Sequence, residues 1–93
     1  MVRRVKFTPV ERDYRNLAIN LVIVGLGRIG IETAKRVWRE PRMNLVGLMD
    51  ISPQLWGKDL AELAEMEEPT GVKVVSSLDE LPKSGIDYAI VTT

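Results

Sequence analysis

Three glycines and one aspartate stand at a spacing that can bind a phosphorylated ligand. Gly25, Gly27 and Gly30 form a Gly-x-Gly-x-x-Gly loop that follows an apolar run and precedes a segment with helical periodicity. Asp50 stands 20 residues beyond the last glycine, at the end of the next apolar run. The first glycine permits a tight turn, the second lets a pyrophosphate approach the backbone, and the third lets the helix pack against its strand. This context favours a dinucleotide-binding loop over a plain turn that needs glycine only for its dihedral angles.

Two charged residues flank this loop. Arg28 falls in the first turn of the predicted helix, where a cation is unfavourable unless an anion such as a pyrophosphate binds there; a solvated arginine is the alternative. Asp50 can accept hydrogen bonds from adenosine ribose hydroxyls and would repel a 2′-phosphate, and a helix-capping or loop-start role is the competing interpretation. Because Ile51 and the two residues after it include no cation, NAD(H) is favoured and NADP(H) is the alternative, with the reach of Lys58 left open.

Two threonines and two tryptophans complete the set of candidate residues. Thr92 and Thr93 end the last apolar run, where their hydroxyls could face the nicotinamide ribose or ring, although threonine is equally common in strands for packing reasons. Trp38 lies on the apolar side of the predicted helix, so we expect it in the core. Trp56 could flank an adenine, but simple packing is the favoured interpretation.

Apolar runs alternate with helical segments along residues 18–93, which we interpret as a partial dinucleotide-binding domain. The sequence predicts strands over 18–24, 44–50, 72–75 and 87–92, helices over 28–39 and 57–67, and a helical turn over 77–81. Right-handed crossovers then give an α/β, Rossmann-type three-layer fold with a parallel sheet of order 3-2-1-4, truncated after the fourth strand. We expect that fourth strand to be an unpaired edge, which predicts a chain that is marginal, self-associates through that edge or relies on further sequence.

The composition excludes several classes of function. The chain has 93 residues, enough for one small domain, and its 13 basic and 13 acidic side chains cancel, which argues against a general nucleic-acid binder. It has no cysteine and no histidine, so we predict no metal site and no thiolate or imidazole catalysis. The lack of cysteine also fits a cytoplasmic location, and no apolar run is long enough to span a membrane.

Residues 1–17 form a basic extension ahead of the predicted domain. Residues 1–19 carry five cations against two anions, which leaves the rest of the chain net negative. Val2, Val5 and Phe7 could form a short edge strand. A partly ordered extension is the favoured interpretation, and an arm that contacts a partner subunit or a polyanion is the alternative.

Several segments of the chain resemble the N-terminal domain of the dihydrodipicolinate reductase-like family, with the 2,4-diaminopentanoate dehydrogenases as its nearest members. The resemblance rests on the glycine loop, LVGLMD ending at Asp50, GKDLAEL from Gly57, GVKVVSSLDEL from Gly71, and DYAIVTT over 87–93. Within GKDLAEL, a Gly-x-Asp-x-x-Glu-Leu pattern separates this family from generic Rossmann domains, and its role there is structural.

The resemblance implies functions for particular residues. It implies a phosphate loop made of Gly25, Gly27, Arg28, Ile29 and Gly30, an adenosine-ribose contact at Asp50, and a nicotinamide-side loop that includes Thr92 and Thr93. A full-length enzyme of this family would move a hydride to or from a C–N or conjugated imine centre of a small amino-acid-like substrate, as a homo-oligomer. Its catalytic residues lie in a further domain, so we assign none here and expect no catalysis from this chain alone.

Other interpretations stay open at this point. The chain could be a free-standing, non-catalytic nucleotide-binding or sensor module, or a structural α/β domain whose glycine loop is vestigial. The glucose–fructose oxidoreductase type of Rossmann domain is also similar in its second and fourth strands. That type usually has a histidine soon after the glycine loop, and this chain has none.

Overall fold

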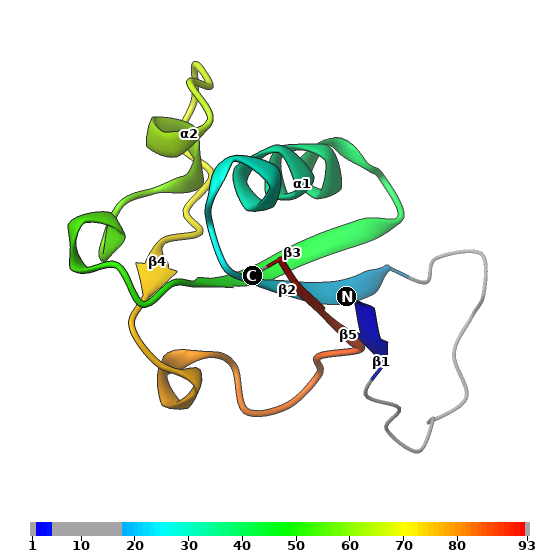
Figure 1. Cartoon of the computed structure of the whole chain (residues 1–93). Helices are drawn as coiled ribbons and strands as arrows, with labels where there is room; N and C mark the ends of the chain where they lie inside the picture. Colours follow the sequence, from blue (N-terminus) through cyan, green and yellow to red (C-terminus); the bar gives the residue numbers. More distant parts are fainter. Residues whose placement is uncertain (1, 5–17, 93) are drawn as a thin grey trace.

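A computed structural model describes residues 2–4 and 18–92 of the chain, which form one five-stranded sheet (Figure 1). The strand order is β1-β5-β2-β3-β4. The strands are β1 Val2–Arg4, β2 Ile19–Val24, β3 Met43–Met49, β4 Val74–Val75 and β5 Tyr88–Val91. The last four are mutually parallel. Their order confirms the predicted 3-2-1-4 arrangement, and their bounds lie within two residues of the predicted ones.

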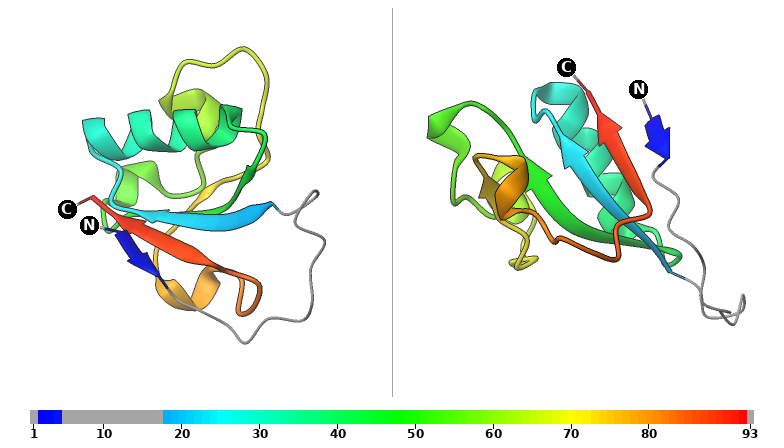
Figure 2. Two further views of the ribbon diagram at one scale, coloured as in Figure 1. Left: turned by 90° about the vertical axis from the view of Figure 1, so that its right-hand side faces the viewer. Right: turned by 90° about the horizontal axis from the view of Figure 1, so that it is seen from below.

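Between Val24 and Tyr88, one long helix and three short helical segments connect the described strands. They are α1 Arg28–Arg39, the 3₁₀ turn η1 Pro53–Leu55, α2 Leu60–Leu63 and the 3₁₀ turn η2 Leu78–Glu80. The helices α1 and α2 lie on one face of the sheet, and η2 lies on the other (Figures 1 and 2). Leu81, just after η2, packs over Gly47 of β3. The third layer of this Rossmann-type fold is therefore thin, since it consists of a single turn and its flanking chain.

The core lies between the sheet and the two helices. Alternate residues of β2 and β3, such as Ile23 and Leu48, face α1 and are fully buried, and Leu60 of α2 joins them. Burial of each such side chain stabilises the fold by about 1.5–3 kcal/mol. Ala34 and Val37 lie on the buried face of α1, so this helix packs against the sheet through small and branched side chains.

The predicted helix over 57–67 is wrong in extent, because only Leu60–Leu63 are helical. Before it, the chain pairs with the segment leading into β4: the Gly57 N–H donates to Val74 O at 2.8 Å and the Leu60 N–H to Val72 O at 3.0 Å. After it, Glu65 adopts a φ of 54°, which ends the helical path. The apolar residues whose spacing suggested a longer helix belong instead to a short helix and an irregular turn.

The prediction of an unpaired edge at the last strand is also wrong. β1 pairs with β5 in an antiparallel register, with Val2 opposite Ile90 and Arg4 opposite Tyr88. The backbone groups on the outer side of β5 therefore have partners within the chain, which removes the edge on which we based self-association. The structure thus confirms an edge strand that includes Val2, while Val5 and Phe7 lie outside the described residues, as does the rest of the predicted extension from residue 5 to residue 17.

Trp38 is a third correction, because we expected it in the core and the residue is 39% exposed. It lies in the last turn of α1, one position beyond the buried Val37. One residue of helix rotates a side chain by about 100°, so Trp38 sits at the boundary of the apolar face rather than at its centre.

Asp59 holds together the segment between β3 and β4. Its Oδ1 accepts hydrogen bonds from the Ala61 N–H at 2.8 Å, the Thr70 N–H at 3.0 Å and the Thr70 hydroxyl at 2.7 Å. Its Oδ2 accepts one from the Gly71 N–H at 2.8 Å. Partial burial raises the pKa of Asp59, but these four hydrogen bonds outweigh burial and hold the pKa well below its ordinary value. The carboxylate therefore caps α2 and fastens the loop that returns to β4.

We expect Asp59→Asn to lower the free energy of unfolding by about 1–3 kcal/mol, because an amide NH₂ would face a backbone donor that the carboxylate now satisfies. Urea unfolding at pH 7 measures this loss. The control is Glu62→Gln, which removes an exposed carboxylate three residues away. Equal unfolding midpoints for the two variants would contradict the role given to Asp59.

The stability difference between the native chain and Asp59→Asn should depend on pH. Folding lowers the pKa of Asp59, so its stabilising effect is fully present above its ordinary pKa of 3.8 and is lost as the pH falls below that value. We therefore expect the stability difference between the native chain and Asp59→Asn to shrink steadily below about pH 4. A difference that grew on acidification would have the wrong sign.

Candidate functional site

The glycine loop leaves β2 through a tight turn at Gly25. This residue has a φ of 95°, which is open to glycine and strained for other residues, and its N–H donates to Met49 O of β3 at 2.9 Å. Leu26 follows and is only 3% exposed, since its side chain enters the core. The loop is therefore held in place by the backbone hydrogen bond of Gly25 and by the buried side chain of Leu26.

Gly30 lets α1 approach the ends of two strands. A Cβ at this position would overlap the carbonyl oxygen of Gly25 and would also come within 2.7 Å of the Thr92 hydroxyl oxygen. Gly30, the third glycine of the motif, thus has the packing role that the sequence predicts for it. Because one contact is with backbone, no side-chain rotation can relieve it.

Gly27 faces open space. It is the N-cap of α1, no side chain caps the helix, and no acidic residue lies in its first turn. A Cβ built on Gly27 would meet nothing within 4 Å. The first N–H groups of a helix have no partners inside it and carry the positive end of its dipole. The N-terminus of α1 therefore offers free donors to a ligand that brings negative charge.

Arg28 and Ile29 form the exposed rim of this helix end. Within the part of the chain that the structure describes, the Arg28 guanidinium has no ion-pair partner at 4.0 Å or closer. A cation at this position opposes the helix dipole unless an anion lies between them. Arg28 is thus free to contact an anion at the N-terminus of α1.

Asp50 is bound to the glycine loop from the end of β3. Its Oδ2 accepts a hydrogen bond from the Leu26 N–H at 2.6 Å, and its Oδ1 accepts one from the Ser52 N–H at 2.8 Å. Partial burial raises the pKa of Asp50, but the hydrogen bonds from Leu26 and Ser52 outweigh burial and hold the pKa below its ordinary value. The carboxylate is therefore ionised near neutral pH, and each oxygen keeps a lone pair for another donor.

Thr92 closes the site from the end of β5. Its hydroxyl donates to Gly25 O at 2.6 Å, and its N–H donates to Val24 O at 2.9 Å. The hydroxyl proton is thus used within the protein, so Thr92 can offer a ligand only an acceptor. Thr93, the other threonine predicted here, lies outside the described residues.

The structure brings most of the predicted residues together at one edge of the sheet. The glycine loop, Asp50 and Thr92 all lie at the carboxyl ends of parallel strands, where open α/β sheets bind ligands. Sequence reasoning missed two features: Leu26 as the anchor of the loop, and the hydrogen bonds that join Asp50 and Thr92 to the loop backbone. These bonds span 24 and 67 residues, so no local pattern signals them.

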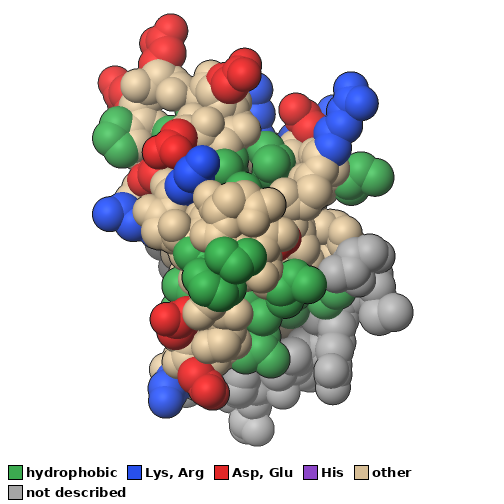
Figure 3. Space-filling model, turned by 60° about the vertical axis from the view of Figure 1, so that its left-hand side comes forward, with side chains coloured by type: hydrophobic (Ala, Val, Ile, Leu, Met, Phe, Trp, Pro, Cys, Tyr) green, Lys and Arg blue, Asp and Glu red, His purple; other side chains and the backbone are tan. Residues whose placement is uncertain are grey.

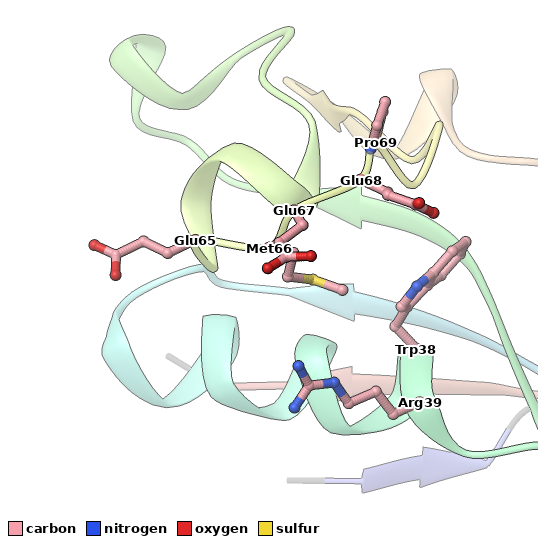
Figure 4. Close-up of a pocket in the computed structure, with 7 residues that line it drawn as sticks. All are labelled: Trp38, Arg39, Glu65, Met66, Glu67, Glu68 and Pro69. Atoms are coloured by element: carbon pink, nitrogen blue, oxygen red, sulfur yellow. The ribbon is translucent and has the colours of Figure 1, made fainter.

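A pocket lies at the other end of α1. Trp38 and Arg39 of the helix line it, together with Met66, Glu67 and Pro69 from the turn after α2 (Figure 4). The 12 residues of α1 separate this pocket from Gly27 by about 18 Å. It is therefore distinct from the glycine-loop site.

Within residues 2–4 and 18–92, no helix is long and apolar enough to cross a membrane. The same residues contain no group of three or more carboxylate, thiol or imidazole side chains that is arranged to hold a metal ion.

We expect Gly30→Ala and Gly27→Ala to have very different effects on folding. Gly30→Ala forces α1 away from Gly25 and should cost at least about 1–3 kcal/mol of stability. Gly27→Ala adds a methyl group in open space at a φ of −72°, so it should cost no more than about 1 kcal/mol through the weaker N-cap. Thermal or urea unfolding of both variants measures this, and equal losses would contradict the packing described for Gly30.

Comparison with known proteins assigns this chain to a family. The model of the family described as dihydrodipicolinate reductase, N-terminus, matches residues 19–92. The chain is 40% identical over 55 residues to a 4-hydroxy-tetrahydrodipicolinate reductase from Nostoc sp. and 38% identical over 55 residues to one from Mastigocladus laminosus. Each match covers 59% of this chain and 20% of the relative, so the matched part of this chain spans about a fifth of those enzymes.

A solved structure is also similar. The crystal structure of GenD2 from gentamicin A biosynthesis, in complex with NAD, superposes with a TM-score of 0.65 and 25% sequence identity. The match covers 95% of this chain and 23% of GenD2. The comparisons confirm both the Rossmann-type fold and the resemblance inferred from the sequence. Since the family model spans residues 19–92, the chain belongs to the dihydrodipicolinate reductase family, within the part described as its N-terminus.

Proposed function

We propose that this chain binds a nicotinamide dinucleotide and forms the cofactor-binding part of a reductase of the dihydrodipicolinate reductase type. The observation that carries the proposal is the uncapped N-terminus of α1, which opens at Gly27 into space that a Cβ would fill. The names of the relatives support the reductase, and the NAD bound to GenD2 supports the cofactor.

The residues of the glycine loop fit the pyrophosphate of such a ligand. The N–H groups at the start of α1 would donate to its oxygens, and the Arg28 guanidinium would add a cation from the rim. Gly25 and Gly30 would keep the loop close to the sheet. Ile29 would contribute its backbone N–H to the pyrophosphate.

Asp50 fits the adenosine ribose. Both carboxylate oxygens already accept one backbone N–H each, which fixes the orientation of the carboxylate. The remaining lone pairs can accept the two ribose hydroxyls, a pairing that Rossmann domains use for NAD. Thr92 would face the nicotinamide half as an acceptor, and Thr93 stays a prediction.

The surroundings of Asp50 favour NAD(H) over NADP(H). A 2′-phosphate would lie against an ionised carboxylate, and Ile51 and Ser52 offer it no positive charge. Lys58 is the nearest cation in sequence after Asp50, and its Nζ lies 3.7 Å from the Glu62 carboxylate, which competes for its charge. Discrimination between the two cofactors would therefore follow from repulsion of the 2′-phosphate at Asp50, which the residues directly after Asp50 do not offset.

In the whole enzyme, the bound cofactor would supply or accept a hydride at a C–N or conjugated imine centre of a small amino-acid-like substrate. The relatives that match this chain are named 4-hydroxy-tetrahydrodipicolinate reductase. These names favour this activity over a free-standing sensor module, a vestigial loop or a glucose–fructose oxidoreductase-type enzyme. A homo-oligomer, a cytoplasmic location and a domain boundary at residue 17 stay predictions.

We expect Gly27→Ala to weaken NADH binding by about 10- to 100-fold, since hydrogen bonds to charged groups contribute about 1.5–3 kcal/mol and the added methyl keeps the pyrophosphate away from them. Calorimetric titration of the native and variant chains with NADH measures this. Because Gly27→Ala should fold normally, circular dichroism separates lost binding from lost structure. A native chain that binds no NADH at millimolar concentration would overturn the proposed function.

We expect Ile51→Arg to shift the ratio of NADPH to NADH affinity by about tenfold or more toward NADPH, because a guanidinium beside Asp50 pairs well with a phosphate. Ile51 is 81% exposed, so the substitution should leave the fold intact. Ile51→Gln is the uncharged control and should leave the ratio unchanged. Native affinity that is higher for NADPH than for NADH would contradict the stated preference.

A further inference from the structure

Trp56 presents an aromatic ring beside Asp50. Its indole N–H donates to the Asp50 carbonyl oxygen at 2.7 Å, while the residue stays 44% exposed. The single polar atom of the ring thus has its partner within the protein. The rest of the indole is apolar, and the hydrogen bond holds it beside the residue whose carboxylate accepts from the glycine loop.

The loop that carries Trp56 is built to hold the ring in place. Pro53 opens the 3₁₀ turn η1, and the Trp56 N–H donates back to its carbonyl oxygen at 3.2 Å. Gly57 follows with a φ of 80°, and its N–H donates to Val74 O of β4 at 2.8 Å. Leu55 packs against the core. Both ends of the turn are therefore fastened, so the ring is preorganised rather than free to fold away.

A second apolar side chain is exposed in the same loop. Ile51 comes directly after Asp50 and is 81% exposed. Figure 3, in which the side of Figure 1 that bears this loop comes forward, shows hydrophobic side chains gathered on the middle of the face, with most charged side chains above and below them. A planar apolar ligand that packed here would remove apolar surface from water without desolvating charged groups, which is favourable.

We propose that Trp56 stacks on the adenine of the dinucleotide and is the residue of this chain that recognises the base. The inference rests on the proposed function, in which the adenosine ribose lies on the Asp50 carboxylate. The base is one glycosidic bond from that ribose, and the indole donates to the backbone carbonyl oxygen of the same Asp50, so the ring is held near the place where the base would lie. Stacking tolerates either face of a purine and needs no hydrogen bond from the ring, whose N–H is already used.

The stacking has a consequence for affinity. We expect Trp56→Leu to weaken binding of NADH, ADP-ribose and AMP alike by about 5- to 100-fold, the range that loss of one base–aromatic stack produces. Trp56→Phe keeps a ring but loses the hydrogen bond to Asp50, so it should lose less than Trp56→Leu. Trp38→Leu is the matched control, because Trp38 is similarly exposed and lies at the far end of α1 (Figure 4).

The two tryptophans also allow a direct optical test. In the Trp38→Phe chain all indole emission comes from Trp56, and we expect ADP-ribose, which lacks nicotinamide, to quench or shift it on binding. In the Trp56→Phe chain the emission of Trp38 should not respond to the same titration. This readout uses the folded Trp38→Phe chain, so it does not depend on whether Trp56→Leu folds.

The outcomes separate this inference from the proposed function. If the native chain and Trp56→Leu bind NADH with equal affinity, or if ADP-ribose binds without changing Trp56 emission, the stacking is overturned and the proposed function stands. If the native chain binds neither NADH nor ADP-ribose, both are overturned. Weakened binding by Trp56→Leu together with a ligand-dependent Trp56 signal supports both.

Discussion

The close approach of α1 to the ends of β2 and β5 is the constraint on which the rest of the structure depends. The Gly25 carbonyl oxygen is the meeting point, because the Thr92 hydroxyl donates to it and any Cβ on Gly30 would overlap it. With the helix seated there, Ala34 and Val37 reach the core, and the N–H groups of its first turn open toward the carboxyl edge of the sheet. The same few atoms therefore set the packing of α1 and the position of the helix end at which we propose that the ligand binds.

Asp50 connects this junction to the neighbouring strand and serves two purposes at once. Structurally, its carboxylate satisfies the Leu26 and Ser52 N–H groups, so it fixes both the glycine loop and the start of the η1 loop. Functionally, those bonds keep it ionised and leave acceptor capacity on the ligand side. Because an ionised carboxylate repels phosphate, the proposed binding puts the ribose hydroxyls of a dinucleotide against Asp50 and its pyrophosphate at Gly27.

The elements that the sequence predicts well are those with local signals. The helix over 28–39 is observed as Arg28–Arg39, because the glycine loop, the apolar spacing and Pro41 all act within a few residues. The helix over 57–67 is wrong because the same apolar spacing fits a short helix and a turn, and the deciding contacts join Asp59 to Thr70 and Gly57 to Val74. The pairing of β1 with β5 joins opposite ends of the chain. In the site, residue types were predictable, but their mutual hydrogen bonds were not.

The carboxyl ends of β3, β2 and β5 offer groups that suit three different parts of one elongated ligand. The end of β3 supplies a carboxylate and an aromatic ring, which suit a sugar and a base. The end of β2 supplies free N–H groups at the start of α1, which suit a pyrophosphate. The end of β5 supplies Thr92, whose proton is used on Gly25 and whose oxygen can only accept. Under the proposed binding, this order gives the ligand a direction: its adenosine would lie over β3 and its second nucleotide would lie toward β5. A reversed ligand would leave Trp56 without the purine and bring it against nicotinamide, so quenching by ADP-ribose alone distinguishes the two directions.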